Sequence, residues 1–317
     1  MVMRRSFYER APHPANIRVC ALSHFPIEAL VSVDIVSTDP VAHGQFFADV
    51  WGLEQVSHQG EAQFFAGTGA DPYVLALVPG DAIGLKAVTF RCSSRALMED
   101  TIAKARAAGC SISDGPPPNA RPGGGYSVDL REPNGCTIRL IHGDELKAPQ
   151  ALQKDRTERL SHVNINTADV DGLAQFYVDV LGMKLTDRSK VMAFLRCNSD
   201  HHVVVLAQAP VEGLNHIAFL LPELEGVMFA SGRLRDHGFE MGWGVGRHGP
   251  GNNVFSYFID PLGYVVEYTA DVLQVDDTYR IGTPSDWTWP KGRTDQWGIA
   301  PPKSAECKAA QIGIGFA

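Results

Sequence analysis

The side chains best suited to chemistry lie in the second half of this 317-residue sequence. They comprise five imidazoles, one phenol and one carboxylate, at His162, His201, His202, His216, His248, Tyr257 and Glu267. Imidazole and carboxylate groups bind metal ions, and imidazole and phenol groups exchange protons or hydrogen bonds with substrates. A single histidine on a strand is usually a hydrogen-bonded core or surface residue. The elements around these side chains therefore decide how they are interpreted.

An internal repeat divides the chain into two halves. Residues 32–39 align with residues 162–169, and residues 45–52 align with residues 175–182. Repeats of this kind indicate a duplicated structural unit. We therefore expect two domains of the same fold, which agrees with the domain count expected for this length.

A second pair of matching segments follows later in each half, so each half contains two modules. Residues 84–90 match residues 213–219, and residues 132–139 match residues 260–267. Periodicity within a module indicates a short strand, an amphipathic helix and then three β-rich segments. We predict an α+β fold in which four βαβββ modules pair into two open-barrel domains. The modules span roughly 31–80, 84–145, 159–209 and 213–270.

The first candidate ligand, His162, begins a predicted strand. Alternate side chains of a strand face opposite sides of the sheet, so His162 and Asn164 share one face and Val163 and Ile165 share the other. The valine and isoleucine can pack beneath the following helix, which directs the histidine and asparagine into the barrel. The other two candidate ligands lie in similar predicted strands.

The two halves differ at the positions that could bind a metal. Where the second half has His162, His216 and Glu267, the first half has Ser32, Ala87 and Arg139, which could not build the same site. We therefore expect a metal in the second half alone. Two neutral imidazoles and one carboxylate form the facial triad typical of non-haem iron(II), whereas zinc more often draws on cysteine or a fourth protein ligand. Iron(II) is favoured, with manganese(II) as the alternative.

The modules and four motifs resemble the type I extradiol ring-cleavage dioxygenases of the vicinal oxygen chelate (glyoxalase-like) superfamily, over residues from about 30 to 275. The motifs are Leu-Ser-His162-Val-Asn, Leu-Asn-His216-Ile-Ala-Phe, Gly-Arg-His248-Gly-Pro-Gly-Asn and Tyr257-Phe-Ile-Asp-Pro-x-Gly-x-x-x-Glu267. The resemblance implies His162, His216 and Glu267 as metal ligands. It implies an oxidoreductase that cleaves a substituted catechol with O2 at Fe(II), giving a hydroxymuconic semialdehyde-type product in aromatic catabolism.

The resemblance also implies roles for the catalytic residues. The family has an acid–base histidine before the last module, where His201 and His202 are adjacent in this chain. We assign His201, because the first histidine is the catalytic one in the family's common pattern, with His202 as the alternative and as a substrate-binding residue. Tyr257 is expected to hydrogen-bond a substrate oxygen, and His248 is expected to orient the substrate.

The remaining substrate-binding candidates are Asn164, Trp243 and Arg293. Family members that cleave acid-bearing catechols have an arginine in the strand before the histidine loop, where this chain has residues 241–246 without arginine. Trp243 and Val245 therefore favour an apolar or neutral ring substituent, although Arg293 could reach a carboxylate from the tail. The glycine-rich loop around His248 is expected to let the backbone approach a small planar ligand.

Four segments follow from these assignments. They are an N-terminal extension (1–30), a metal-free domain (31–148), a catalytic metal-binding domain (159–275) and a C-terminal tail rich in tryptophan and proline (276–317). We expect the tail to wrap over the surface without a regular element.

Composition limits the partners and the location. The net charge of −8 argues against nucleic acid as a partner. We find neither a membrane span nor a signal peptide, and the six scattered cysteines suit free thiols, so a cytoplasmic location is expected. The expected partners are a catechol and O2, with the chain itself forming a homo-oligomer.

Two alternatives to the dioxygenase remain. A glyoxalase or epimerase-type metal lyase or isomerase of the same superfamily also uses strand-borne histidine and glutamate ligands. Such enzymes usually draw ligands from both halves or from a partner chain, and they do not need the additional histidines and the tyrosine. A metal-free small-molecule binding protein is the other alternative, and the three intact ligand positions argue against it.

Overall fold

The computed structural model describes residues 25–317. Residues 1–24, which make up most of the expected N-terminal extension, lie outside the described residues. The first strand, β1 (Ile27–Ser37), begins at Ile27 rather than at residue 31. Ile27 and Leu30 are buried in the hydrophobic core, which is why these residues join the sheet.

The first half forms one eight-stranded sheet in the order β2-β3-β4-β1-β5-β8-β7-β6. Strand β1 pairs in parallel with β4 and antiparallel with β5, so the two modules meet at the β1–β5 pair. The elements after β1 are α1 (Pro40–Gln45), a π-helical segment (Phe46–Trp51), β2 (Glu54–Gln59), β3 (Ala62–Ala66), β4 (Leu75–Pro79), β5 (Gly84–Cys92), α2 (Arg95–Ala107), β6 (Ser111–Asp114), a short 3-10 helix (Pro118–Ala120), β7 (Tyr126–Arg131) and β8 (Thr137–His142).

The second half repeats this arrangement in the order β10-β11-β12-β9-β13-β16-β15-β14. Each half therefore contains two βαβββ modules, which confirms the predicted order of elements and the fold class. The elements are β9 (Arg159–Thr167), α3 (Val170–Asp179), β10 (Lys184–Arg188), β11 (Met192–Arg196), β12 (Val204–Gln208), β13 (Gly213–Leu220), α4 (Leu224–Asp236), β14 (Trp243–Arg247), β15 (Val254–Ile259) and β16 (Val265–Ala270).

Helix α3 illustrates how the sequence builds a module. The side chain of Asp169 caps the helix, because its Oδ1 accepts a hydrogen bond of 2.9 Å from the backbone N–H of Gly172. Leu173, Phe176 and Tyr177 recur at helical spacing and are buried against the sheet. Each such side chain contributes about 1.5–3 kcal/mol through burial. This packing leaves the opposite face of the sheet for the barrel interior.

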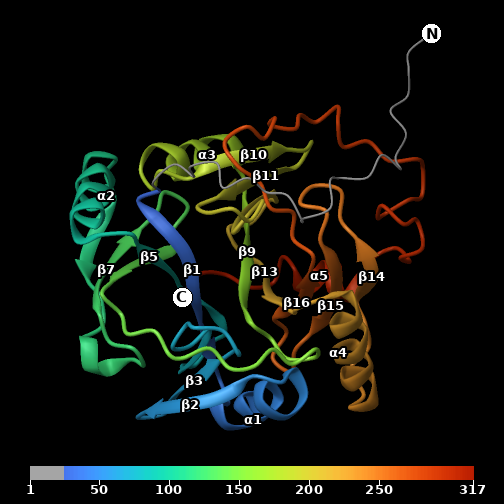
Figure 1. Ribbon diagram of the computed structural model, residues 1–317, viewed down its shortest axis with the longest axis horizontal. Helices are drawn as coiled ribbons and strands as arrows, with labels where there is room; N and C mark the ends of the chain where they lie inside the picture. Colours follow the sequence, from blue (N-terminus) through green and yellow to red (C-terminus); the bar gives the residue numbers. More distant parts are fainter. Residues whose placement is uncertain (1–24) are drawn as a thin grey trace.

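The two halves pack together along their first strands. Figure 1 shows β1 and β9 side by side near the centre of the molecule, and these strands contact each other. Trp51 of the first half stacks on Tyr268 of β16, with ring centroids 3.7 Å apart. Asp260 of the second half accepts a hydrogen bond of 2.7 Å from the buried His43. These buried contacts fix the first half against the second half.

The C-terminal tail contains a helix, which contradicts the expectation that it lacks a regular element. Helix α5 (Ala305–Ala310) begins where the side chain of Ser304 accepts a hydrogen bond of 3.1 Å from the N–H of Cys307. This cap follows Pro301 and Pro302, which mark the end of the irregular run. After α5 the chain adds isolated bridges from Ile314 to Leu214 and from Phe316 to Leu85, so the tail touches both sheets (Figure 1).

Two observations concern membrane crossing and the state of the cysteines. Within residues 25–317 no helix has the length and apolar character needed to cross a membrane. The cysteines in this part of the chain are free thiols, at Cys92, Cys110, Cys136, Cys197 and Cys307.

Candidate metal centre and active site

Three neighbouring strands place the three predicted ligands on one face of the second sheet. His162 lies on β9, His216 on β13 and Glu267 on β16, and β13 pairs with both of the other strands. Ala218 of β13 is directly opposite both His162 and Glu267. Ala218 follows His216 by two residues and therefore shares its face, and its small side chain leaves room between the ligands. The adjacent Ile217 belongs to the hydrophobic core.

The three ligand atoms lie close enough together to share one metal ion. His162 Nε2 is 3.1 Å from His216 Nε2 and 3.2 Å from Glu267 Oε2, and His216 Nε2 is 3.0 Å from the same oxygen. Adjacent ligand atoms of an octahedral ion with bonds of about 2.1 Å are about 3 Å apart. All three residues are buried. The arrangement therefore fits a two-histidine, one-carboxylate metal site.

The protonation states also suit a metal. Burial lowers the pKa of His216 to about 4, which leaves its imidazole neutral and able to coordinate through a lone pair. Burial alone would raise the pKa of Glu267, but His162 and His216 outweigh burial and hold it well below its ordinary value. Apart from the contacts of Oε2 with these two imidazoles, neither oxygen of Glu267 accepts a hydrogen bond from the described residues. A buried carboxylate without such partners is costly, and a bound cation would offset that cost.

A hydrogen bond to the neighbouring Asn215 orients one of the ligands, His216. His216 Nδ1 lies 2.8 Å from Asn215 Oδ1 and donates to it, which leaves Nε2 without a proton. The amide of Asn215 also accepts a hydrogen bond of 2.8 Å from Gln311 Nε2 in the tail. The tail therefore takes part in positioning a metal ligand.

The first half has ion pairs at the corresponding place. Thr89 is opposite both Ser32 and Arg139, as Ala218 is opposite His162 and Glu267, so the sheet register supports the predicted equivalence. The guanidinium of Arg139 contacts the buried Asp34 and also Asp129, at 2.5 and 2.8 Å. Within residues 25–317, the one cluster of three metal-ligating side chains is His162, His216 and Glu267.

A cavity of about 330 Å³ adjoins the metal site. It is lined by His162, Asn164, His202, His216, Trp243, His248 and Tyr257, together with tail residues that include Trp287, Trp289, Lys303 and Gln311. The tail thus forms one wall of the cavity. Of the substrate-binding candidates, Asn164, His202 and Trp243 line the cavity, whereas Arg293 does not.

The adjacent histidines His201 and His202 occupy different environments. His202 lines the cavity, and its ring centroid is 4.5 Å from that of His162. His201 is fully buried behind it and does not line the cavity. The Nδ1 atoms of the two rings are 3.0 Å apart. The structure thus gives His202 access to the cavity and places His201 in contact with His202.

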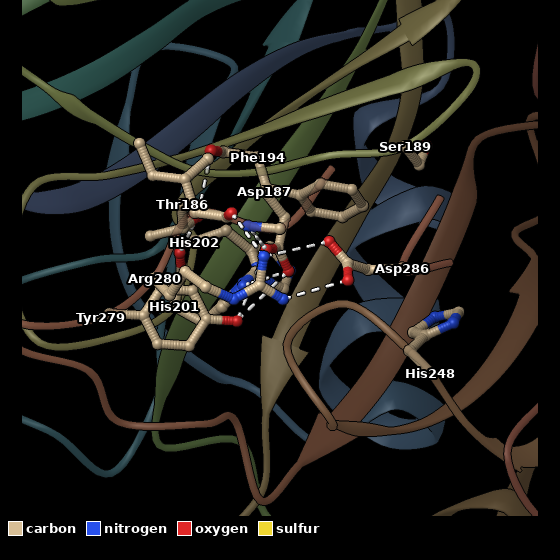
Figure 2. A network of polar contacts seen from close by, with 12 residues as sticks. Thr186, Asp187, Ser189, Phe194, His201, His202, His248, Tyr279, Arg280 and Asp286 are labelled. Atoms are coloured by element: carbon tan, nitrogen blue, oxygen red, sulfur yellow. Dashed lines mark hydrogen bonds and ion pairs between the residues drawn. The ribbon is translucent and has the colours of Figure 1, made fainter. Parts of the chain in front are cut away.

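Asp187 anchors this pair from the far side (Figure 2). Its Oδ2 is 2.8 Å from His201 Nε2, and its Oδ1 accepts a hydrogen bond of 2.8 Å from the backbone N–H of Gly282. Tyr279 Oη lies 3.4 Å from the same carboxylate. Sequence reasoning missed Asp187, because it lies on β10, which is distant in sequence from both histidines and from the tail that clamps it.

His248 and Tyr257 form a second polar pair at the cavity. His248 Nε2 lies 3.0 Å from Tyr257 Oη, and Tyr257 pairs with Glu267 across β15 and β16. Burial lowers the pKa of His248 to about 3 and raises the pKa of Tyr257 well above its usual range. The imidazole is therefore neutral and the phenol keeps its proton. The pair can exchange a hydrogen bond with each other or with a ligand.

The glycine-rich loop around His248 has a packing role. Gly251 has φ of 75°, and a Cβ there would lie 2.6 Å from His202 Cε1. A Cβ on Gly249 would lie 2.7 Å from the Trp289 ring. The sequence led us to expect that the backbone of this loop approaches a planar ligand. In the structure the planar groups next to Gly251 and Gly249 are the side chains of His202 and Trp289.

Comparisons with known proteins agree with this geometry. Residues 159–268 match the family model of the glyoxalase/bleomycin resistance protein/dioxygenase superfamily. Metapyrocatechase 2 of Cupriavidus necator is 35% identical over 44% of this chain and 42% of its own length, so the match spans less than half of that relative. Biphenyl-2,3-diol 1,2-dioxygenase 3 of Rhodococcus globerulus is 32% identical over 42% of this chain and 69% of its own length.

Solved structures extend the likeness to most of the chain. The Mn(II)-bound glyoxalase from Novosphingobium aromaticivorans is 32% identical, covers 89% of this chain and 94% of its own, and has a TM-score of 0.82. A variant of homoprotocatechuate 2,3-dioxygenase from B. fuscum shares the fold, with 20% identity, 89% and 82% coverage and a TM-score of 0.76. The chain belongs to the glyoxalase/bleomycin resistance protein/dioxygenase superfamily, and within it to the type I extradiol dioxygenases.

Proposed function

We propose that the chain cleaves the ring of a substituted catechol with O2 beside the two hydroxyls, giving a hydroxymuconic semialdehyde-type product in aromatic catabolism. The observation that carries this proposal is the buried triad of His162, His216 and Glu267 beside a cavity that also contains His202, His248 and Tyr257. A facial triad keeps open positions for a chelating substrate and dioxygen.

We propose iron(II) as the metal, with manganese(II) as the alternative. Relatives include an iron-dependent extradiol dioxygenase of Rhodococcus jostii and a manganese-dependent 2,3-dihydroxybiphenyl 1,2-dioxygenase of Geobacillus genomosp. 3. The two histidines and Glu267 would hold the ion. When bound, it supplies a Lewis acid that favours the deprotonated catechol and a route for electrons between ring and dioxygen.

His202 takes the acid–base role in this proposal, in place of His201. Asp187 accepts the Nε2 proton of His201, so Nδ1 of His201 accepts the Nδ1 proton of His202. This chain of hydrogen bonds leaves Nε2 of His202 with a free lone pair. Burial and the neighbouring imidazoles hold the pKa of His202 well below its usual range, so the ring is neutral. It can take a proton from a substrate hydroxyl and return it in a later step.

Tyr257 and His248 bind the substrate in this proposal. The phenol keeps its proton and can donate to a substrate oxygen, while His248 Nε2 holds the phenol at 3.0 Å. Phe255 stacks on the His248 ring at 4.0 Å between centroids, which fixes the plane of the imidazole. Asn164 Oδ1 is buried without a hydrogen-bond partner among residues 25–317 and lines the cavity, so it can accept a hydrogen bond from the substrate.

Anaerobic loading with iron(II), followed by a catechol panel and then air, tests this function. The expected result is a yellow product near neutral pH with one O2 consumed per catechol. The panel includes methyl-, chloro-, phenyl- and carboxyl-substituted catechols. If protein with a measured full complement of iron turns over none of them, the proposed function is wrong.

A glyoxalase activity is the second candidate, because the Mn(II)-bound glyoxalase from Novosphingobium aromaticivorans matches 89% of this chain. All three ligands of this chain come from one half, and the cavity contains the His202, His248 and Tyr257 set that isomerisation of a hemithioacetal does not need. The manganese-loaded protein mixed with methylglyoxal and glutathione discriminates between the two. Thioester formation at 240 nm, without catechol cleavage by the iron-loaded form, would favour the glyoxalase.

A further inference from the structure

The cavity wall is positively charged. Its charged lining residues, among those the structure describes, are Lys190 and Lys303; the carboxylate of Glu267 lies against the lining imidazoles of His162 and His216, where a bound metal ion would offset its charge. Lys190 is exposed, in the turn between β10 and β11, whereas Lys303 is partly buried and comes from the tail just before α5. A cavity with this lining favours a ligand that carries negative charge.

Neighbouring side chains hold the ammonium group of Lys303 in place. Its Nζ donates a hydrogen bond of 2.7 Å to Gln311 Oε1 and lies 4.4 Å from the centroid of the Trp243 ring and 5.3 Å from that of Tyr257. Contacts over aromatic faces attract a cation but do not neutralise it. Within residues 25–317 Lys303 forms no ion pair with a carboxylate. Its ammonium therefore keeps donors that a ligand can use.

We propose that Lys303 binds an anionic substituent, such as a carboxylate, on the ring of the substrate. This inference rests on the proposed function, since it assigns the chemical class of the catechol. Buried charges in proteins are usually paired, and the ligand would supply the missing partner. Burial lowers the pKa of Lys303, and an anion beside it would offset that effect. Residues 241–246 contain no arginine and Arg293 lies outside the cavity, which favoured a neutral ring substituent from sequence, but Lys303 brings a cation into the cavity from the tail.

Binding of matched ligands to iron-loaded protein without oxygen tests the proposal separately from turnover. The probes are 3,4-dihydroxybenzoate and 2,3-dihydroxybenzoate, each compared with its neutral amide by calorimetric titration. In Lys303→Met the Kd of at least one acid should rise about tenfold or more, because a charge-assisted hydrogen bond is lost. The Kd of the matching amide should change less than about twofold, and Lys303→Arg should keep part of the preference for the acid.

Lys308→Met is the matched control, because Lys308 lies in the tail on α5, is exposed to solvent and does not line the cavity. At physiological salt its replacement should change either Kd less than about twofold. Equal weakening of acid and amide in Lys303→Met would overturn the proposal and would place Lys303 at the catechol oxygens. Loss of iron from Lys303→Met, or an equal effect in Lys308→Met, would also overturn it. Absence of ring cleavage with preserved acid selectivity would instead refute the proposed function alone.

Discussion

Replacing Asp187 with asparagine should reverse the hydrogen bonds behind the cavity. Asp187 Oδ1 accepts from the N–H of Gly282, and Oδ2 accepts from His201 Nε2. Asparagine has one carbonyl oxygen, which the backbone donor at Gly282 would take, so its NH2 group would face His201. The imidazole of His201 must then accept at Nε2 and donate from Nδ1. His202 would carry its proton on Nε2 and could no longer take one from the substrate.

The expected fall in kcat follows from the strength of the hydrogen bond between His201 and Asp187. A bond of 2.8 Å between an imidazole and a carboxylate contributes about 1.5–3 kcal/mol. Because His202 must recover the active tautomer at that cost, kcat should fall about 10- to 150-fold. KM should change little, since Asp187 does not line the cavity. The measurement is steady-state oxygen consumption by protein loaded anaerobically with iron(II), with the metal content of each sample determined.

Tyr279→Phe is the control for Asp187→Asn. It removes only the 3.4 Å contact with the carboxylate and leaves the His201 hydrogen bond in place. We expect its kcat to stay within about twofold of the wild type. A kcat for Asp187→Asn that also stays within twofold, at full iron content, would refute the reasoning about the tautomer. A fall in kcat explained entirely by lost iron would refute it as well.

Four further substitutions test other parts of the structure. Glu267→Ala should lose the metal, because it removes the one carboxylate of the triad, and full occupancy by metal analysis would contradict the ligand assignment. His202→Phe should retain the metal and lose about 10²- to 10⁴-fold in kcat, and near-normal turnover would rule out His202 as the acid–base group. Gly251→Ala should lower both Tm and kcat, since its Cβ would lie 2.6 Å from the His202 ring; unchanged values would argue against this packing role. Burial raises the pKa of Glu132 to about 8. Between pH 4.5 and 8 the folded state therefore binds more protons than the unfolded state, and the free energy of unfolding falls as pH rises. Glu132→Gln should flatten that dependence in urea unfolding, and an unchanged slope would contradict it.

The repeat and the alternation of side chains determined the fold and the ligand set from sequence. His162, His216 and Glu267 lie inside regular strands, where position along the chain fixes the face of the sheet. The first half lacks these side chains at equivalent positions, and aligning the two halves of the sequence is enough to show this difference. Local pattern was sufficient here because each ligand's direction depends on its own strand.

Tertiary structure alone decided what surrounds the metal site. His201 and His202 precede β12 in an irregular segment, where no periodicity fixes which ring meets the cavity. Asp187 reaches His201 from another strand, and Lys303 reaches the cavity from the tail. Such contacts join residues far apart in the chain, so their geometry depends on how sheets and tail pack together. The sequence by itself thus determined the residues of the metal site, whereas packing decided which histidine lines the cavity and which charged side chains surround it.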